Sequence, residues 1–413
     1  MNAAANPDFR KLWAAQAVSG VGARITRDGL PILAVAGLAA TPGQLGLMAA
    51  LASGATLILT LASGGRIDRT RRRPVLIGAD LLRAAVLIAL PLAAWLGAIT
   101  LWQVFAAAIL VAAASVVFDI ADHAYLPSLI DRDQITDGNA RLSATDSVAE
   151  VGGPALAGLL FQWLAGPIAV AVNAATYLVS AGLLLTIRKP EAQPRPEGPA
   201  PGWRADVAAG FKAAWREPLV RPLLLMTAAG GLFGAFFSAL YVVFALRVLQ
   251  LTPAMLGLTI AAGGIGALAG AALAQPMARR LGVGPAIFAA SAGATLAALL
   301  IPLAPAEPGL GMAFLVAAQV FGDALAVAGV VLMASLRQTV LPAQLLGRVG
   351  ASFHAVGGGM AVAGALIGGA LGGLIGPREA LYVAVAGLAL SPLIALASPP
   401  LRCLREMHKP LSG

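Results

Sequence analysis

A few charged side chains stand inside long apolar stretches of the chain. Arg24, Arg27 and Asp28 interrupt the first apolar run, and Gln319 and Asp323 lie in the middle of a later one. Ionisable groups at membrane depth usually face a cavity and mark substrate or ion pathways. A buried carboxylate can take up and release a proton as its access to water changes. These residues therefore predict a charged cavity, with Asp28 and Asp323 as the candidate carriers of an exchanged proton.

Two interpretations of the charges in the first run remain open. Arg24 and Asp28 are four residues apart, so on a helix they share a face and can form a local ion pair. The same arginine, together with Arg27, would form a cationic pocket for an anionic or carboxylate-bearing substrate. A purely structural ion pair is the alternative.

Aromatic side chains concentrate in one stretch of the second half of the chain. Phe233, Phe237 and Tyr241 lie there together with Phe236. They would line a cavity wall that contacts an amphipathic compound, although ordinary packing between helices explains the same pattern. Gln319 and Asp323 share a helix face and complete the candidate cavity residues of this half.

Acidic residues also gather in the fourth and fifth apolar runs, towards one end of each. We interpret them as structural pairs of a gate in preference to proton carriers. The acids are Asp119, Asp122, Asp146 and Glu150, and their candidate partners are Arg83, Arg141 and His123.

The composition is that of a membrane protein. Of the 413 residues, 59% are hydrophobic and 11% are charged, against about 25% charged in an ordinary soluble domain. The mean hydropathy is +0.84. The single cysteine, Cys403, excludes an intrachain disulfide, and the three histidines are scattered, so neither a metal site nor another cofactor is expected.

The segments that carry these side chains must be helices that cross a bilayer. Each such helix needs about 20 mostly apolar residues. The polar breaks predict twelve such helices in an all-α membrane protein. The expected spans are residues 11–37, 44–66, 74–96, 99–122, 142–165, 168–187, 219–248, 254–277, 284–303, 309–336, 349–374 and 378–398.

Lysine and arginine fall mostly in the loops on one side of this arrangement. Because basic loops resist translocation, that side is predicted to be cytoplasmic and to hold both termini. The expected location is the inner membrane. The formal net charge of +9 then needs no nucleic-acid partner to explain it.

The spans fall into two halves of nearly equal length. We expect an N-terminal six-helix bundle at residues 1–187, a cytoplasmic linker at 188–218, a C-terminal six-helix bundle at 219–398 and a cytoplasmic tail at 399–413. The linker is rich in proline and charge, and its stretch from Trp203 to Trp215 is either an interfacial helix or a solvated loop.

A sequence repeat supports two pseudo-symmetric halves. Residues 152–158 and 358–364 both read Gly-Gly-x-Ala-x-Ala-Gly, and each follows a Leu-Pro pair and an arginine, Arg141 or Arg348. Small residues let helix backbones approach closely in lipid. Spans five and eleven should therefore pack tightly, with a binding site near the bilayer midplane between the halves.

The loop after the second span resembles the loop signature of the major facilitator superfamily, Gly-x-x-x-Asp-Arg-x-Gly-Arg-Arg. Gly64, Asp68, Arg69, Arg72 and Arg73 match it. The resemblance implies that Asp68 and Arg72 take part in an ion network that holds the cytoplasmic ends of the two halves together. The alternative is that the arginines only mark a cytoplasmic loop, as basic residues commonly do. It also implies the major facilitator fold.

Other motifs resemble the macrolide-efflux and enterobactin-exporter branch of that superfamily. They are Phe9–Trp13 with Gln16, Tyr125–Leu129, Asn139–Ala140, Gly153–Pro154 and Gly347–Val349. Gly153, Pro154 and Gly158 are similar to the end of the fifth-span motif of the superfamily's antiporters. The resemblance covers the whole chain and leaves the substrate open.

The expected function is secondary active export of a small amphipathic compound, such as a drug, siderophore or secondary metabolite, in exchange for protons. No phosphate-binding loop of the Gly-x-x-x-x-Gly-Lys-Ser/Thr type occurs, so direct use of ATP is not expected, nor is an enzyme activity. Membrane lipid is an expected partner, and the protein is expected to be a monomer. A lipid or lysophospholipid translocase, a nutrient importer and a non-transporting membrane receptor are the alternatives.

Overall fold

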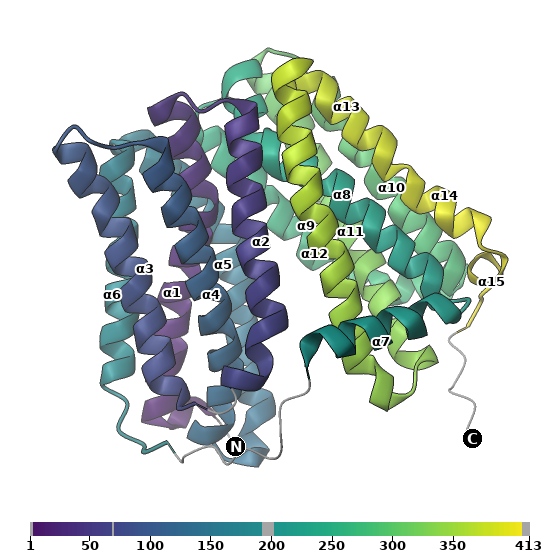
Figure 1. Cartoon of the computed structure of the whole chain (residues 1–413), viewed down its shortest axis with the longest axis horizontal. Coiled ribbons are helices and arrows are strands. Elements are labelled where there is room, and N and C mark those ends of the chain that lie inside the picture. The colour runs from purple at the N-terminus through teal and green to yellow at the C-terminus, as the bar shows by residue number, and fades with distance from the viewer. Residues whose placement is uncertain (1–2, 68–69, 192–201, 407–413) are drawn as a thin grey trace. The chain divides into compact units, whose positions relative to one another are not determined.

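The computed structural model describes residues 3–67, 70–191 and 202–406, and every regular element in these ranges is helical (Figure 1). Ten helices in the described part of the chain are long and apolar enough to cross a membrane. These ten candidate spans correspond to ten of the twelve predicted ones. The other two predicted spans correspond to α1 (Pro7–Ile32) and α5 (Ile135–Trp163), which are long enough but carry several charges each.

The chain divides into two compact units that do not follow a single cut in the sequence. Unit 1 contains residues 1–40, 58–201 and 252–257, and unit 2 contains residues 41–57, 202–251 and 258–413. Helices α2 (Pro42–Ile67) and α9 (Pro253–Leu281) therefore each contribute to both units.

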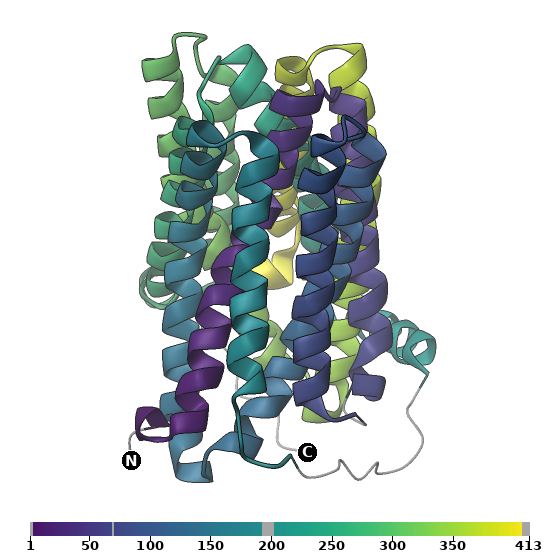
Figure 2. The ribbon, with the colours of Figure 1, turned by 90° about the vertical axis from the view of Figure 1, so that its left-hand side faces the viewer.

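Unit 1 is built on five complete helices. Besides α1 and α5, these are α3 (Arg72–Trp95), α4 (Leu101–Leu129) and α6 (Gly166–Leu185), with the short turns η1 (Ala3–Ala5) and η3 (Arg132–Gln134). Helix α6 packs against both α1 and α3, beside which it runs in Figure 2.

Helix starts in unit 1 follow from local chemistry. Asn6 accepts hydrogen bonds from the backbone N–H groups of Asp8 and Phe9, with Pro7 at the first helical position of α1. Thr100 and Gln103 form a capping box at the start of α4. Such caps satisfy backbone donors that the helix itself leaves unpaired.

Unit 2 contains the remaining helices. They are α7 (Trp203–Arg216), α8 (Val220–Val243), α10 (Val283–Leu303), α11 (Pro308–Val340), α12 (Ala343–Leu374), α13 (Pro377–Leu388), α14 (Leu390–Ala397) and α15 (Pro399–Arg402). Helix α7 lies crosswise to the long axes of α8 and α12 (Figure 1).

Helix α12 packs very closely on α8, as the glycine repeat predicts for the eleventh span. A Cβ atom at Gly364 would meet the backbone of Leu232, and one at Gly368 would lie 2.9 Å from the Cα atom of Phe236. Backbones this close need residues without side chains at the contact. Glycines therefore set the spacing of the two helices that form much of unit 2.

Two local backbone features recur 211 positions apart, at residues 33–42 and 244–253. The π-helical turns η2 (Leu33–Gly37) and η4 (Phe244–Val248) extend α1 and α8. Each is followed by a residue other than glycine in the left-handed region, Ala39 at φ 53° or Gln250 at φ 55°. The peptide N–H two positions before each following proline bonds back to a carbonyl, Ala40 to Ala34 at 2.9 Å and Leu251 to Ala245 at 3.0 Å. Both features lie where the chain passes from one compact unit to the other.

Candidate functional site

Four charged side chains of α1 and α5 form one ionic cluster in unit 1. Glu150 contacts both Arg24 and Arg27, and its distance to Arg27 Nη2 is 3.0 Å. Arg27 Nε also lies 3.4 Å from Asp28 Oδ1. The side chain of Arg27 keeps 46% of its surface exposed, whereas that of Asp28 keeps 13%. With two arginines and two carboxylates, the cluster is electrically balanced and partly accessible.

The geometry of the cluster differs from the local pairing that the sequence suggests. Arg24 pairs with Glu150 on α5, and Asp28 pairs with its neighbour Arg27. The i, i+4 relation of Arg24 and Asp28 is overridden because α5 brings a carboxylate to α1 from outside the helix. Arg27 joins the same cluster through Asp28 and Glu150.

Gly153 allows this approach of α1 to α5. A Cβ atom at Gly153 would lie 3.0 Å from Arg24 Cγ and would meet Arg24 Cβ still more closely. The arginine stem thus passes directly over the glycine, and its guanidinium reaches Glu150 one turn earlier on α5. Pro154 is buried next to it within α5. These two motif residues therefore position the ionic cluster.

A second ion pair lies in the centre of unit 1. Arg83 Nη2 is 2.6 Å from Asp80 Oδ1, both on α3, and the two residues are 1% and 0% exposed. Ser19 of α1 donates to the same Asp80 oxygen at 3.0 Å, and Arg83 donates to Ser115 of α4 at 3.4 Å. One buried pair thereby connects three helices.

Aromatic rings enclose the Arg83 guanidinium. Its central carbon lies 4.4 Å from the ring centre of Phe118 and 4.6 Å from that of Tyr177. The Tyr177 hydroxyl is 3.3 Å from the Thr26 hydroxyl, which also accepts from the Asn173 amide at 2.6 Å. Cation–π contacts of a desolvated guanidinium are worth about 2 kcal/mol, so the rings partly replace water around this charge.

The sequence analysis missed this pair, because it treated Arg83 only as a partner for acids on α4 and α5. The available signal was the i, i+3 spacing of Asp80 and Arg83 within one apolar run, which places them on one helix face.

The acids of α4 and α5 lie near the predicted cations Arg83 and His123 without forming salt bridges to them among the described residues. Asp122 is 2% exposed and accepts a hydrogen bond from the Gln16 amide of α1. Ring Nδ1 of His123 is 2.8 Å from the carbonyl oxygen of Asp119 on its own helix. Among the described residues, none of Asp119, Asp122 and Asp146 forms a salt bridge with Arg83, Arg141 or His123. Asp119 still lies within electrostatic reach of Arg83 and His123, and Asp122 and Asp146 within reach of His123.

Arg141 instead pairs within α5, ahead of the predicted span. Its Nε donates to Asp137 Oδ2 at 3.0 Å, and its guanidinium lies 5.7 Å from the Trp13 ring centre. The hydrogen bonds from Arg141 and from the Ala3 backbone lower the pKa of Asp137. Arg141 thus connects α5 with the start of α1.

The polar residues of unit 2 form a smaller group between α8, α9 and α11. The Tyr241 hydroxyl donates to Thr259 at 3.1 Å. Asp323 and Gln319 lie against Gly263 of α9, where an added Cβ atom would be 3.5 Å from Gln319 Cβ and would meet an Asp323 carboxylate oxygen more closely. Gly263 therefore leaves the room that the Asp323 carboxylate occupies.

The aromatic residues of α8 divide between packing and the polar group. Phe233 contacts Gly387 of α13, and its ring centre lies 5.8 Å from that of Phe236. Tyr241 is 8% exposed and belongs to the polar group described above. Phe237 is partly buried. The structure thus places Phe233 at a helix contact and Tyr241 beside Asp323.

Arg72 and Arg73 begin α3 and meet a carboxylate from the chain after α6. The Glu191 carboxylate accepts from their backbone N–H groups at 2.7 and 3.1 Å, and Arg73 also donates to the carbonyls of Leu184 and Leu185. A carboxylate at a helix N-terminus is electrostatically favourable. The predicted latch residues Asp68 and Arg69 lie outside the described residues, and Gly64 is part of α2.

Asp8 fastens the start of α1 to the same segment. Its carboxylate binds Lys11 Nζ at 2.8 Å and the backbone N–H of Lys189 at 2.9 Å. These bonds, that to Lys11 above all, lower the pKa of Asp8.

In unit 2, Arg348 has the corresponding contact with α7. Its Nε lies 3.0 Å from Asp206 Oδ1, and Ser352 donates to the Val207 carbonyl at 2.8 Å. Gly210 lies directly against the Arg348 backbone, where any Cβ atom would collide. Helix α7 is therefore fixed to the first turns of α12.

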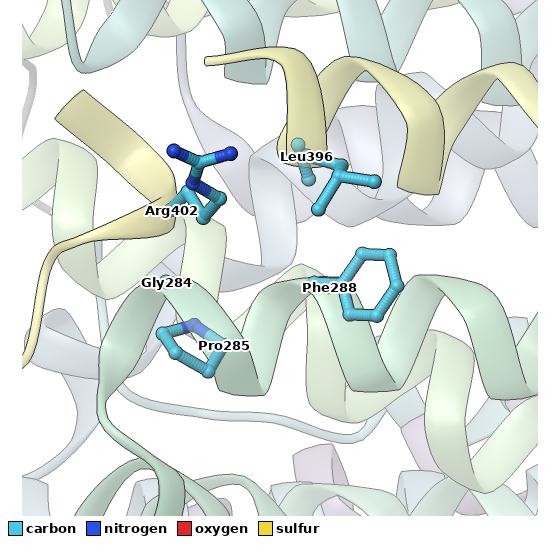
Figure 3. Close-up of a pocket in the computed structure, with 6 residues that line it drawn as sticks. Gly284, Pro285, Phe288, Leu396 and Arg402 are labelled. Atoms are coloured by element: carbon cyan, nitrogen blue, oxygen red, sulfur yellow. The ribbon is translucent and has the colours of Figure 1, made fainter. Parts of the chain in front are cut away.

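No group of three or more acidic, histidine or cysteine residues within the described ranges could hold a metal ion. A small cavity of about 100 Å³ lies between α10 and α14, lined by apolar side chains such as Phe288 and Leu396 with Arg402 at its edge (Figure 3). It contains none of the candidate cavity residues.

Long apolar helices, with ionisable groups collected among them, define a helical membrane protein, and its fold is the major facilitator fold. Solved structures of this fold support the assignment. A bacterial homologue of the iron transporter ferroportin in its inward-facing state has a TM-score of 0.77 at 17% identity, covering 94% of this chain and 98% of that one. The nucleoside transporter NupG has a TM-score of 0.75 at 13% identity, covering 96% and 99%.

Within this fold, the chain belongs to the transmembrane secretion effector family, whose model matches residues 3–409. Among curated proteins, the enterobactin exporter EntS of Salmonella typhi is 27% identical over 405 residues, which cover 95% of this chain and 92% of that protein. The protein is accordingly a multi-pass membrane transporter and not an enzyme.

Proposed function

We propose that the protein exports a small amphipathic compound in exchange for protons by alternating access, and that siderophores are the substrate class to test first. The similarity to an enterobactin exporter along almost the whole chain supports export of this class. The proposed location is the inner membrane with both termini in the cytoplasm, and the proposed working unit is a monomer in contact with lipid.

The observation that carries the proposal is the ionic cluster of Arg24, Arg27, Asp28 and Glu150. Its charges are balanced and partly accessible, so a substrate group can exchange with an internal partner without leaving a bare charge. A carboxylate or phenolate would take the place of Glu150 on the arginines. The cluster thus serves as the substrate site of unit 1, with Phe237, Tyr241 and Gln319 as the candidate contacts of unit 2.

Coupling to protons requires a carboxylate that is charged in one state and neutral in another. Asp28 and Asp323 are the proposed carriers, since Asp323 lies near the middle of α11 and Asp28 lies in α1 shortly before its π-helical extension η2. Exchange follows if substrate binding and proton binding oppose each other, because such a linkage is reciprocal. The gate residues of the proposal are Gly64, Asp68, Arg69, Arg72, Arg73, Asp119, Arg141, Gly153, Pro154 and Arg348.

The test is flux of enterobactin in proteoliposomes under an imposed pH gradient. We expect accumulation driven by the gradient, collapse with a protonophore, and weaker pH-driven accumulation in Asp28→Asn and Asp323→Asn at normal expression. Accumulation that is equal with and without the gradient would contradict proton coupling, and equal accumulation in both variants would contradict the two carriers.

Two alternative functions predict different results, one in the same vesicles and one after cross-linking. Transfer of a labelled lysophospholipid between leaflets, without flux of enterobactin, would indicate a lipid translocase. Retained biological activity after the fourth-to-fifth and tenth-to-eleventh loops are cross-linked would indicate a receptor, since a transporter must move.

A further inference from the structure

The contact between Gln16 of α1 and Asp122 of α4 lies apart from the ionic cluster and has an unusual hydrogen-bond balance. The Gln16 amide nitrogen donates to Asp122 Oδ2. The other oxygen of each group, Gln16 Oε1 and Asp122 Oδ1, is buried and has no hydrogen-bond partner. Two planar groups thus meet with one hydrogen bond made and two acceptor oxygens left unsatisfied.

An ionised carboxylate at Asp122 has no cation in contact with it among the described residues. Asp122 is 2% exposed, and burial of an ionised carboxylate without a partner cation is strongly unfavourable. Three arginines within the helices of unit 1 bind other carboxylates: Arg24 and Arg27 bind Glu150, and Arg83 binds Asp80. A single neutral amide donor does not replace them.

The groups that face Asp122 do not supply a counter-charge in contact. They are Asp119 and His123 on α4, Asp146 on α5 and Gln16 on α1. The two acids oppose a negative charge on Asp122. The described residues show no salt bridge between His123 and Asp122, and the bond that His123 makes goes to the Asp119 carbonyl.

One added proton satisfies both free oxygens. A proton on Asp122 Oδ1 turns that atom into a donor, and Gln16 Oε1 is an acceptor on the same partner group. The carboxylic acid and the amide then form a cyclic pair with two hydrogen bonds in place of one. The two unsatisfied side-chain oxygens are fewer than the ligands that hard cations usually take.

We propose that the Gln16–Asp122 pair is a proton-binding site, occupied in the dehydrated state and emptied when water reaches it. This inference rests on the proposed proton coupling and deepens it by adding a third carboxylate. Asp122 differs from Asp28, whose charge has Arg27 beside it at 3.4 Å.

Proton binding at this pair alters the attachment of α1 to α4. The neutral pair holds the helices by two hydrogen bonds, whereas the charged form has one hydrogen bond and needs solvent. Gln16 lies on the same helix as Arg24 and Arg27. The protonation state of Asp122 can therefore bias the position of the helix that carries the proposed substrate site.

The first test reads the proton directly and needs no substrate. We expect infrared difference spectra of the full chain in lipid nanodiscs, recorded across a pH step, to contain a protonated-carboxyl band. Asp122→Asn should lose this band, since its amide keeps the cyclic pair with Gln16 without a titrating group. Asp119→Asn, one turn away, is the matched control and should keep it.

Either of two spectral results would overturn the proposal. One is a set of titrating carboxyl bands that Asp122→Asn leaves unchanged. The other is a band that sodium ions abolish at constant pH, which would assign the site to a metal cation.

The second test connects the site to transport. A gradient of one pH unit supports about tenfold accumulation for each exchanged proton. Asp122→Asn should retain enterobactin exchange at equal pH and lose the gradient-driven part, so that accumulation falls by about that factor. Full gradient-driven accumulation in Asp122→Asn would overturn the coupling role. Failure of the wild-type protein to respond to pH would instead contradict the proposed function, while the spectra would still decide whether Asp122 binds a proton.

Discussion

Units 1 and 2 both pack long helices in an apolar solvent, but they use different side chains to do so. In unit 1, buried or partly buried charges connect the helices, as at Arg24–Glu150 and Asp80–Arg83. In unit 2, α8 and α12 meet through glycines, and Asp323 is the single acidic residue between Glu307 and Glu379 in the sequence.

The difference separates two tasks. Ion pairs hold helices together only while their partners remain in place, so they can rearrange when a proton or a charged ligand arrives. Glycine contacts depend on shape alone and do not respond to pH. From this comparison we expect unit 1 to respond to protons and charged ligands, and the glycine-packed helices of unit 2 to keep their spacing around Asp323.

The largest expected effect comes from breaking the buried pair of unit 1. Arg83→Ala leaves Asp80 charged and buried, and removing one partner of such a pair costs about 3–5 kcal/mol. We expect a large loss of folded protein, measured as unfolding free energy in detergent. The double variant Asp80→Leu with Arg83→Met should recover most of the loss, because no charge stays unpaired. A single variant as stable as the wild type would contradict the structural role of the pair.

A smaller effect is expected at the accessible cluster, where function should suffer more than folding. Glu150→Gln removes the carboxylate that both arginines bind. A hydrogen bond to a charged group is worth about 1.5–3 kcal/mol, or about 10–150-fold in rate. We expect enterobactin flux to fall within that range. Asp133→Asn, at an exposed carboxylate outside the cluster, is the control, and equal flux in both variants would remove the cluster from the mechanism.

The contact between α8 and α12 in unit 2 should be destabilised by an added side chain. Gly364→Ala places a methyl group against the Leu232 backbone, whereas Gly373→Ala on the same helix enters open space. Overpacking of this kind costs about 1–3 kcal/mol. We expect the first variant to unfold at lower temperature at every pH and the second to match the wild type. A pH-dependent loss in Gly364→Ala would contradict a contact based on shape.

The smallest effect is a pH-dependent one at the edge of unit 1. Because the pKa of Asp8 is lowered in the folded protein, its contribution to stability is present above the unfolded value of about 3.9 and is lost as the pH falls below it. Asp8→Asn should lower the melting temperature slightly at pH 7, and the difference should shrink under acid conditions. Asp131→Asn is the control; a difference that grows with acidity would reverse the assignment.

Much of the fold could be predicted because span length and apolarity are properties of single segments. The same holds for the tight packing of the eleventh span, which depends on its own glycines. The two predicted spans that fail the apolar criterion are α1 and α5, and their charged side chains pair with each other. The sequence of one segment alone therefore does not show that its charges have partners.

The pairing of the site residues was harder to predict for the same reason. The sequence marks Arg24 and Asp28 as charged residues on one face, but which carboxylate Arg24 binds depends on Gly153, a residue of another helix. The contact of Gln16 with Asp122 likewise joins residues 106 positions apart. Asp80 and Arg83 were within reach of the i, i+3 rule, which the sequence analysis did not apply to that helix.

The repeated turns after α1 and α8 bear on how the protein can be divided. Each directs the following helix into the other compact unit, so residues 41–57 belong with unit 2 and residues 252–257 with unit 1. A gene cut between residues 201 and 202 would yield two fragments, each carrying a stretch that completes the other. Such fragments should be degraded when made alone and restore one another when made together, because neither contains all the residues of one compact unit.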